Sequence, residues 1–395
     1  MKWLFSATVR HACAMRKHVQ KILNHQRDIL APKAVSEVES AMQEIKDAVA
    51  SKADKAALDK QMENLEKAAE KWLKPYPNAG WRENVEVLLV ALAVAMGIRT
   101  FFLQPFKIPT GSMQPTLFGV TSKNLIDQRD FKISTGLERV RQWFQGISYI
   151  HIVADNDGEL QAVEPPVGIK IINIMQSVVL GGKSCTIWFP PDYGEQTLLT
   201  RANLEIGHFY HKGEDVVKLE VHAGDHLFVD RATYNFRPSK RGEIVVFETK
   251  GIPEERRINP PYWTIPPDQF YIKRLVALGG ERVQIGDDRH LIIDGRRLDA
   301  SMPHFENVYS FNPNAPPRDS HYSGHVNLPQ TPYFRSLQSR DDGMLVSPGH
   351  CLVMGDNTMS SLDSRFWGEF PASSVIGKSF FVYWPITTRF GWGNR

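Results

Sequence analysis

The chain has 395 residues, of which 42% are apolar and 23% charged, so it can build two or three folded domains and is not a disordered protein. Lysine and arginine total 47 and aspartate and glutamate total 44, a balance that gives no reason to expect a nucleic-acid partner. Cys13, Cys185 and Cys351 are far apart and show no Cys-x-x-Cys spacing. Neither a zinc site nor a disulfide scaffold is predicted, and a Cys185–Cys351 bridge stays open as the less favoured alternative.

The N-terminal region, residues 1–80, has a helical composition. Between residues 14 and 74 it is rich in Ala, Glu, Lys and Gln, with no glycine and only Pro32 as a helix breaker. We predict one or two surface helices, with a short coiled coil as an alternative, and the sequence does not identify their partner. The apolar positions recur at helical spacing, namely Val38, Met42, Ile45 and Val49, then Leu58, Met62 and Leu65.

A long apolar run follows a Pro/Gly/Asn-rich break at residues 74–80. Of the 19 positions from 85 to 103, only Glu86, Gly97, Arg99 and Thr100 are not apolar. As a helix this run is about 28 Å long, close to the roughly 30 Å hydrocarbon core of a bilayer. We predict one transmembrane helix over 84–104 and expect the basic N-terminal region on the cytoplasmic side. A buried core helix is the less favoured alternative, because residues 87–96 leave no polar face.

After the apolar run, the sequence changes to short segments rich in Val, Ile and Phe that are separated by Gly, Asp and Pro. This pattern predicts a mainly β domain over 105–390, an antiparallel sheet or partly open barrel. Two stretches resemble insertions, at about 120–220 and 300–343. The first has strand-like patterning, and the second is rich in Pro, Ser and Asn.

Ser112 lies on a stiff segment directly after the predicted membrane helix. Pro109 and Pro115 favour extended backbone around it, and Gly111 permits close approach of another chain segment. Such a serine can be presented to a substrate. The segment alone does not identify a nucleophile, however, because most serines are solvent-facing or turn residues.

A serine hydroxyl needs a base, and a lysine serves only when it is neutral. Lys273 lies in an apolar strand-like run at 270–278, where alternation places it on the face opposite Ile272 and Arg274. Burial there would lower its pKa toward the working pH. The pattern alone leaves open a solvent-facing Lys273.

The segment 354–368 has a Gly355-Asp356-Asn357 turn followed by hydroxyl residues and the pair Asp363 and Arg365. These groups can shape a loop and hydrogen-bond a neighbouring amine. Read by itself, the segment is a polar turn.

Together these segments resemble the motifs of bacterial signal peptidase I, the preprotein peptidases that use a Ser/Lys dyad. Residues 108–117 are similar to the family's nucleophile motif, 268–280 to its lysine motif and 355–368 to its third motif. Residues 224–247 are similar to a further motif, with Glu243 in place of the usual Asp. Thr358 and Met359 replace a more usual Arg and Asp, and the separation of Ser112 from Lys273 is longer than usual.

The resemblance implies roles for individual residues. Ser112 would be the nucleophile and Lys273 the general base. Thr110 and the backbone N–H of Ser112 would form an oxyanion hole. The implied supporting residues are Ser361, which would orient the lysine, with Asp363, Arg365, Gly355, Asp356 and Asn357. The implied substrate-binding residues are Phe106, Ile108, Tyr271 and Ile272, which would line shallow pockets for small side chains.

The resemblance also implies preprotein signal peptides as substrates, a lipid bilayer as partner, no cofactor and no metal. The expected location is the bacterial cytoplasmic (inner) membrane, with a cytoplasmic N-terminus and an extracytoplasmic catalytic domain. The main alternative is a membrane-tethered scaffold with an inactive peptidase domain. A metal hydrolase built on His208/His211 or His222/His226 is disfavoured, because no His-Glu-x-x-His pattern occurs. A self-cleaving repressor is disfavoured by the predicted membrane span and by the lack of an apparent helix-turn-helix. A penicillin-binding protein is disfavoured because no Ser-x-x-Lys occurs, and an α/β-hydrolase because Ser112 does not lie in a Gly-x-Ser-x-Gly motif.

Overall fold

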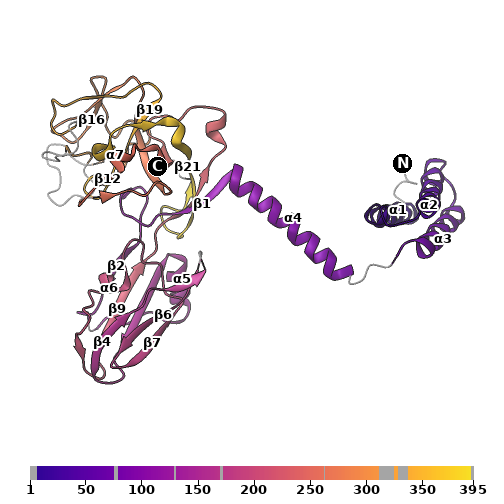
Figure 1. The fold of residues 1–395 in the computed structure, drawn as a ribbon, viewed down its shortest axis with the longest axis horizontal. Coiled ribbons are helices and arrows are strands. Elements are labelled where there is room, and N and C mark those ends of the chain that lie inside the picture. Colours follow the sequence, from indigo (N-terminus) through magenta and orange to yellow (C-terminus); the bar gives the residue numbers. More distant parts are fainter. Residues whose placement is uncertain are drawn as a thin grey trace. The chain divides into compact units, whose positions relative to one another are not determined.

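The structure is a computed structural model that describes residues 7–74, 79–128, 130–169, 172–261, 263–310, 324–327 and 337–392 (Figure 1). Much of the insertion predicted at 300–343 therefore lies outside the described residues. The chain forms two compact units, Met1–Leu92 and Ala93–Arg395.

The first unit contains a bundle of three helices, α1 (Ala7–Gln26), α2 (Pro32–Ala50) and α3 (Lys55–Trp72). The structure thus has three helices around a shared core rather than the one or two surface helices or coiled coil expected. Proline at the start of α2 suits a first helical position, and Asp54 caps α3 by accepting a hydrogen bond from Ala57 N at 2.8 Å. The helices pack through their predicted apolar positions, with Val38, Met42, Ile45, Leu58 and Leu65 buried and Val49 and Met62 partly buried against them.

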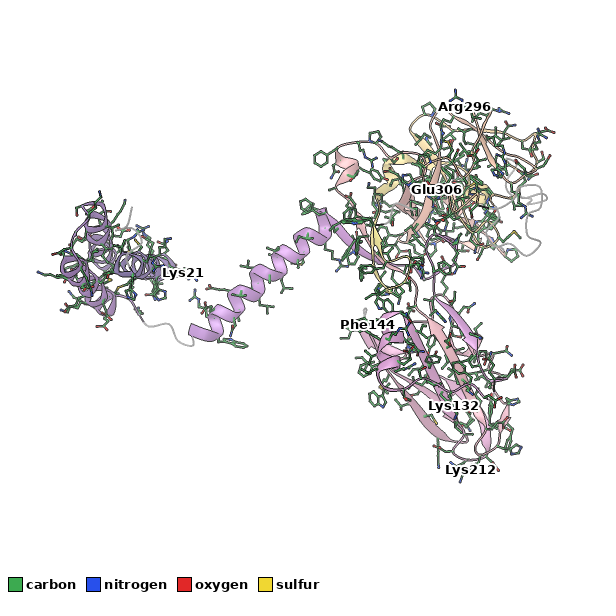
Figure 2. All side chains as sticks on the ribbon, turned by 180° about the vertical axis from the view of Figure 1, so that it is seen from behind. Lys21, Lys132, Phe144, Lys212, Arg296 and Glu306 are labelled. Atoms are coloured by element: carbon green, nitrogen blue, oxygen red, sulfur yellow. The ribbon has the colours of Figure 1, made fainter. Side chains whose placement is uncertain are left out.

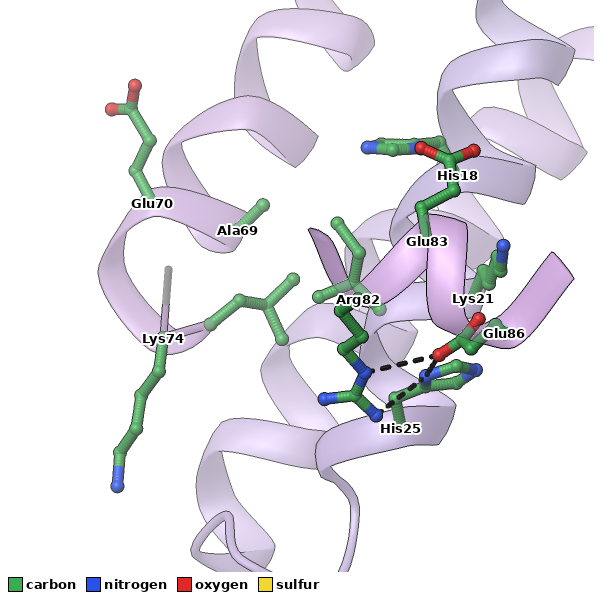
Figure 3. A pocket seen from close by; sticks show the side chains of 11 residues that line it. His18, Lys21, His25, Ala69, Glu70, Lys74, Arg82, Glu83 and Glu86 are labelled. Atoms are coloured by element: carbon green, nitrogen blue, oxygen red, sulfur yellow. Dashed lines mark hydrogen bonds and ion pairs between the residues drawn. The ribbon is translucent and has the colours of Figure 1, made fainter. Parts of the chain in front are cut away.

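Helix α4 (Ala79–Phe101) carries the apolar run. The segment Gly80–Phe101 is long and apolar enough to cross a membrane, and none of it is buried against other parts of the chain. Where α4 begins, the first unit has a hollow of about 650 Å³, which Figure 3 shows from close by. Arg82 Nε donates to Glu86 Oε1 at 3.1 Å, and His25 Nδ1 lies 3.9 Å from the same oxygen. The residues that line this hollow include no serine, threonine or cysteine that could act as a nucleophile.

The second unit is built on antiparallel strands, which confirms the predicted mainly β fold class. Its largest sheet is open, with β1 and β20 at its two ends, and runs in the order β1-β10-β21-β11-β14-β19-β20, with β22 paired to β21. The strands are β1 (Leu103–Lys107), β10 (His226–Asp230), β21 (Val375–Trp384), β11 (Ile244–Glu248), β14 (Phe270–Leu278), β19 (His350–Met354), β20 (Phe370–Pro371) and β22 (Gly391–Trp392).

Both faces of this sheet are covered at its centre. Ile244 and Val246 of β11 pack with Ile108 on one face, whereas Val245 and Phe247 pack with Trp367 on the other. Successive strand residues point to opposite faces, so a strand buried on both sides reads as a continuous apolar run. The short helices α7 (Glu254–Arg257) and α8 (Ser364–Trp367) and the small sheets of β12 (Ile258–Asn259), β13 (Trp263–Thr264), β15 (Arg282–Ile285), β16 (Leu291–Ile293), β17 (Arg296–Arg297) and β18 (Met344–Leu345) complete this part.

Residues 121–222 form a separate lobe with its own apolar core. Figure 2 shows Phe144 at the end of this lobe nearer the large sheet and Lys212 at its far end. At the near end, Ile386 N donates to Phe144 O at 2.9 Å. The lobe contains β2 (Thr121–Asn124), α5 (Gly136–Phe144), β3 (Ile147–Val153), β4 (Gly158–Val163), β5 (Val167–Ile169), β6 (Ile172–Leu180), β7 (Lys183–Trp188), α6 (Leu198–Arg201), β8 (Phe209–Tyr210) and β9 (Asp215–His222).

A buried ion pair joins the C-terminal segment to the chain between β9 and β10. Arg389 Nε donates to Asp225 Oδ2 at 2.9 Å, and the Asp225 side chain is fully buried. The same carboxylate accepts from Phe118 N at 2.8 Å, while Asp225 O accepts from Ile108 N at 2.9 Å. Asp225 therefore holds both ends of the segment that carries Ser112.

We predict that Arg389→Met lowers the free energy of unfolding by about 3 kcal/mol, because it leaves the Asp225 carboxylate buried without its cation. Urea unfolding of the detergent-solubilised chain measures this change. Arg340→Met is the control, since the Arg340–Asp287 pair is 66% and 76% exposed and should change the same quantity by less than about 1 kcal/mol. Equal effects of the two substitutions would contradict this view of Asp225.

Candidate active site

The segment between β1 and β2 places Ser112 at the sheet. Ile108, Met113 and Leu117 are buried in one apolar cluster, and Leu117 N donates to Met113 O at 2.9 Å to close a turn. A Cβ on Gly119 would lie 2.1 Å from Thr110 O, so this turn requires glycine there. The Ser112 side chain is thereby held in place, and the residue is only 4% exposed.

Lys273 comes from the middle of β14, where it pairs with Val245 of β11. It shares a face with Tyr271 and Leu275, while Ile272 packs on the opposite face, as strand alternation predicted. Lys273 Nζ lies 2.7 Å from Ser112 Oγ, within hydrogen-bond distance. The residue is 5% exposed, so the solvent-facing alternative for Lys273 is excluded.

Burial lowers the pKa of Lys273 from 10.5 to about 8, while the carboxylates of Asp363, Glu195 and Asp356 raise it by smaller amounts. Desolvation penalises the ammonium form more than these carboxylates favour it. The amine is therefore mostly neutral above pH 8, where it can accept a proton.

The Gly355-Asp356-Asn357 turn binds the backbone of the segment that carries Ser112. Asn357 N donates to Ser112 O at 3.0 Å, and Asn357 Nδ2 donates to Gly111 O at 3.0 Å. A Cβ on Gly355 would lie 2.4 Å from Ser112 O, so only glycine allows this close approach. The turn thus fixes the backbone on which Ser112 sits.

Asp363 and Arg365 form a fully buried ion pair, with Arg365 Nε donating to Asp363 Oδ1 at 2.9 Å. Asp363 Oδ2 also accepts from Gly355 N at 3.0 Å, which links the pair to the turn. Arg365 donates to Thr358 Oγ1 at 2.7 Å, so Thr358 is part of the network. The arginine and these hydrogen bonds hold the pKa of Asp363 below its usual value in spite of burial.

Two hydroxyls accompany the pair of Ser112 and Lys273. Thr110 Oγ1 lies 3.3 Å from Ser112 Oγ, close enough for a hydrogen bond between the two hydroxyls. Ser361 is buried, and its Oγ forms no standard hydrogen bond with the described residues, so the expected contact with Lys273 is not made. The hydroxyl nevertheless lies near enough to Asp363 to contribute to the low pKa of that carboxyl.

A second buried ion pair was not predicted. Arg274 Nε donates to Asp356 Oδ1 at 2.7 Å, and both side chains are fully buried. Thr116 Oγ1 donates to Asp356 Oδ2 at 2.5 Å, which connects the segment that carries Ser112 to the turn after β19. The presence of Arg274 in an apolar strand could have indicated a buried ion pair, but the sequence does not show which carboxylate is its partner.

The four predicted substrate-binding residues differ in exposure and in the apolar cluster to which they belong. Ile108 is 2% exposed, and Phe106 and Ile272 pack partly buried against the same cluster. The ring of Tyr271 lies 5.6 Å from Lys273 Nζ. Phe106 also packs edge-on against Phe270, which is 44% exposed and continues the apolar surface outward.

The histidines weighed as metal ligands have other neighbours. His208 packs against Tyr210, and His222 Nε2 lies 2.6 Å from Glu220 Oε1. Among the described residues, no group of three His, Cys, Asp or Glu is arranged to hold a metal. Cys13, Cys185 and Cys351 are free thiols, so the Cys185–Cys351 bridge is not formed.

The fold and this site define a class of protein in which an antiparallel sheet carries a lysine amine against a serine hydroxyl. The sequence model of the family described as "Signal peptidase, peptidase S26" matches residues 81–130 and 205–384, more than half of the chain. The chain therefore belongs to the signal peptidase family. The match is interrupted between residues 130 and 205, within the lobe formed by residues 121–222.

Several curated relatives are named signal peptidase I or probable signal peptidase I. The chain is 30% identical over 169 residues to a signal peptidase I of Leptolyngbya laminosa, covering 42% of this chain and 63% of that protein. It is 27% identical over 162 residues to a probable signal peptidase I-2 of Synechocystis sp., covering 41% and 56%. The chain thus spans less than two thirds of the length of these relatives. A solved signal peptidase I of Enterococcus faecalis is 25% identical, with 36% of this chain and 97% of that chain covered and a TM-score of 0.22.

We predict that Lys273→Met stabilises the folded chain at pH 7. The wild-type amine is disfavoured in its charged form, since its folded pKa of about 8 lies below its unfolded value of 10.5. The resulting cost is fully present below pH 8, on the order of 3 kcal/mol, and disappears as the pH rises through 10.5.

Thermal unfolding midpoints of both proteins at pH 7 and pH 10.5 measure this effect. The advantage of the methionine variant should be large at pH 7 and nearly absent at pH 10.5. A difference between the two proteins that does not change with pH would mean that Lys273 is not a desolvated amine.

Proposed function

We propose that this protein is a membrane-bound serine endopeptidase that removes signal peptides from exported preproteins. The observation that carries the proposal is the 2.7 Å separation of Lys273 Nζ and Ser112 Oγ, with both residues buried in a chain of the signal peptidase family. A neutral lysine is a competent base for a serine hydroxyl at that distance.

In the proposed reaction, Ser112 Oγ attacks the carbonyl carbon of the scissile peptide bond while neutral Lys273 takes the hydroxyl proton. The negative charge that develops on the carbonyl oxygen is stabilised by the backbone N–H of Ser112 and the hydroxyl of Thr110, an effect worth about 3 kcal/mol per donor. The Lys273 ammonium then donates its proton to the leaving amine as the C–N bond breaks. Water, deprotonated by the same amine, hydrolyses the acyl-enzyme and restores Ser112.

The preprotein would bind in an extended conformation beside the site. Strand β1 lies at one end of the large sheet, and a peptide can extend such a sheet through backbone hydrogen bonds. Phe106, Ile108, Tyr271 and Ile272 would line shallow pockets at the site. Such pockets favour the small side chains of an A-x-A-like cleavage site.

We assign helix α4 as the anchor in a bacterial cytoplasmic membrane. Its span Gly80–Phe101 has a mean hydropathy of 1.7, and its side chains are not buried by the protein. The N-terminal helices would then lie in the cytoplasm and the second unit on the opposite side, where exported preproteins emerge. The lipid bilayer is the partner of α4, whereas no partner is assigned to the helices α1 to α3.

The alternative of a membrane-tethered scaffold with an inactive peptidase domain has less support. An inactive domain has no need of a lysine buried against a serine, because that burial costs stability at neutral pH. The following two experiments distinguish the two functions.

We predict that Ser112→Ala abolishes preprotein cleavage, lowering kcat by at least about 10⁴-fold, since no other group replaces the nucleophile. Cleavage of a purified preprotein by the detergent-solubilised protein is followed on gels and by mass spectrometry. Ser184→Ala is the control, because Ser184 lies exposed on β7, and this variant should cleave normally. Unchanged processing by Ser112→Ala would leave the scaffold as the better explanation.

The pH dependence of kcat/KM should report the Lys273 amine. Only the neutral amine accepts a proton, so kcat/KM should fall about tenfold per pH unit below a pKa of about 8 and level off above it. A peptide substrate without ionisable side chains isolates the enzyme's own titration. A profile that stays flat between pH 6 and pH 9 would rule out Lys273 as the base.

A further inference from the structure

The turn Asp192–Glu195 of the lobe packs against the segment that carries Ser112. It lies between β7 and α6, in the part of the chain that the family match does not cover. Asp192 forms an ion pair with Lys107 at the end of β1. Gly194, at φ +69°, approaches so closely that a Cβ on it would lie 2.7 Å from Pro109 O.

The turn is held rigidly in this position. Arg201 of α6 donates through Nε to Tyr193 O at 2.6 Å and through Nη2 to Val120 O at 3.1 Å. Tyr193 is itself buried, and its hydroxyl donates to Gln176 Oε1 at 2.8 Å. The lobe therefore holds Glu195, which follows Gly194, at a fixed place beside the segment that carries Ser112.

Glu195 is exposed, and its carboxylate makes no ion pair or hydrogen bond with the part of the chain that the structure describes. Lys107, a nearby cation, is already paired with Asp192. The Glu195 charge reaches the site, because it raises the pKa values of both Lys273 and Tyr271. A carboxylate whose charge acts on Lys273 also acts on any charge that a bound peptide places at the site.

We propose that Glu195 is a specificity-determining residue that favours substrates with lysine or arginine close to the scissile bond and disfavours those with aspartate or glutamate. The proposal rests on the proposed function, since it describes substrate choice at the same site. Its physical basis is the Coulomb interaction between Glu195 and a substrate side chain, which salt screens because Glu195 is exposed.

The test uses peptides with one Ala-x-Ala cleavage site, in which lysine, glutamine or glutamate is placed in turn at each of four positions near the scissile bond other than the two alanines. For wild-type protein at low salt, at least one position should give a kcat/KM about threefold to fivefold higher with lysine than with glutamate. Glu195→Gln should remove this preference, and Glu195→Lys should reverse it. High salt should weaken the wild-type preference.

Glu205→Gln is the matched control, because Glu205 is also an exposed glutamate of the lobe but lies outside this turn. It should keep the wild-type preference. A second measurement, the pH profile with the glutamine peptide, should shift to lower pH in Glu195→Gln, since a carboxylate that raises the Lys273 pKa has been removed.

Cleavage of the glutamine peptide by wild-type protein tests the proposed function separately from the charge preference. If that peptide is cleaved but no position shows a preference that Glu195→Gln removes, the role of Glu195 is refuted and the peptidase remains. If the peptide is not cleaved at all, the proposed function itself fails.

Discussion

The amine of Lys273 lies 2.7 Å from the Ser112 hydroxyl only because three segments distant in sequence are held together by buried polar groups. Strand β14 supplies the lysine, the turn after β1 supplies the serine, and the turn after β19 binds the backbone of the serine segment. Apolar contacts alone would not fix these segments to within a fraction of an ångström, since apolar packing has no direction. Hydrogen bonds from Asn357 to Gly111 O and Ser112 O supply that direction.

The buried charges around the site fall into two groups with different consequences. Arg274 with Asp356 and Arg365 with Asp363 are paired and hydrogen-bonded, so each remains ionised inside the protein. Lys273 instead lies against a neutral hydroxyl, and burial is the largest influence on its pKa. The same burial that favours the neutral lysine therefore makes it unfavourable to bury as a cation, while the paired groups provide the rigid frame around it.

The sequence predicted the fold class from local pattern, whereas the site residues were predicted from the resemblance to the signal peptidase I motifs. Alternation along β14 placed Lys273 opposite Ile272, and the turn residues Gly355 and Asn357 were assigned to the site from their motif. The sequence could not predict that Arg274 pairs with Asp356 or that Asp225 pairs with Arg389, because such partners are set by tertiary packing. It also underestimated the N-terminal helices, since helical spacing shows which residues face inward but not how many helices share the core.

Ser112 and Lys273 are 161 residues apart, yet the long separation does not disturb the site. The lobe begins with β2 and ends with β9, and these two strands pair, with Thr121 opposite His222. The two ends of the lobe therefore lie side by side where they join the rest of the second unit. The lobe is thus inserted at one point of that unit and does not separate its parts. Burial of the lobe's own apolar core offsets the entropic cost of bringing these two ends together, so the site does not have to supply that free energy. A lobe attached in this way can change in sequence without moving Ser112, except at the turn Asp192–Glu195, where Gly194 packs closely against the segment that carries Ser112.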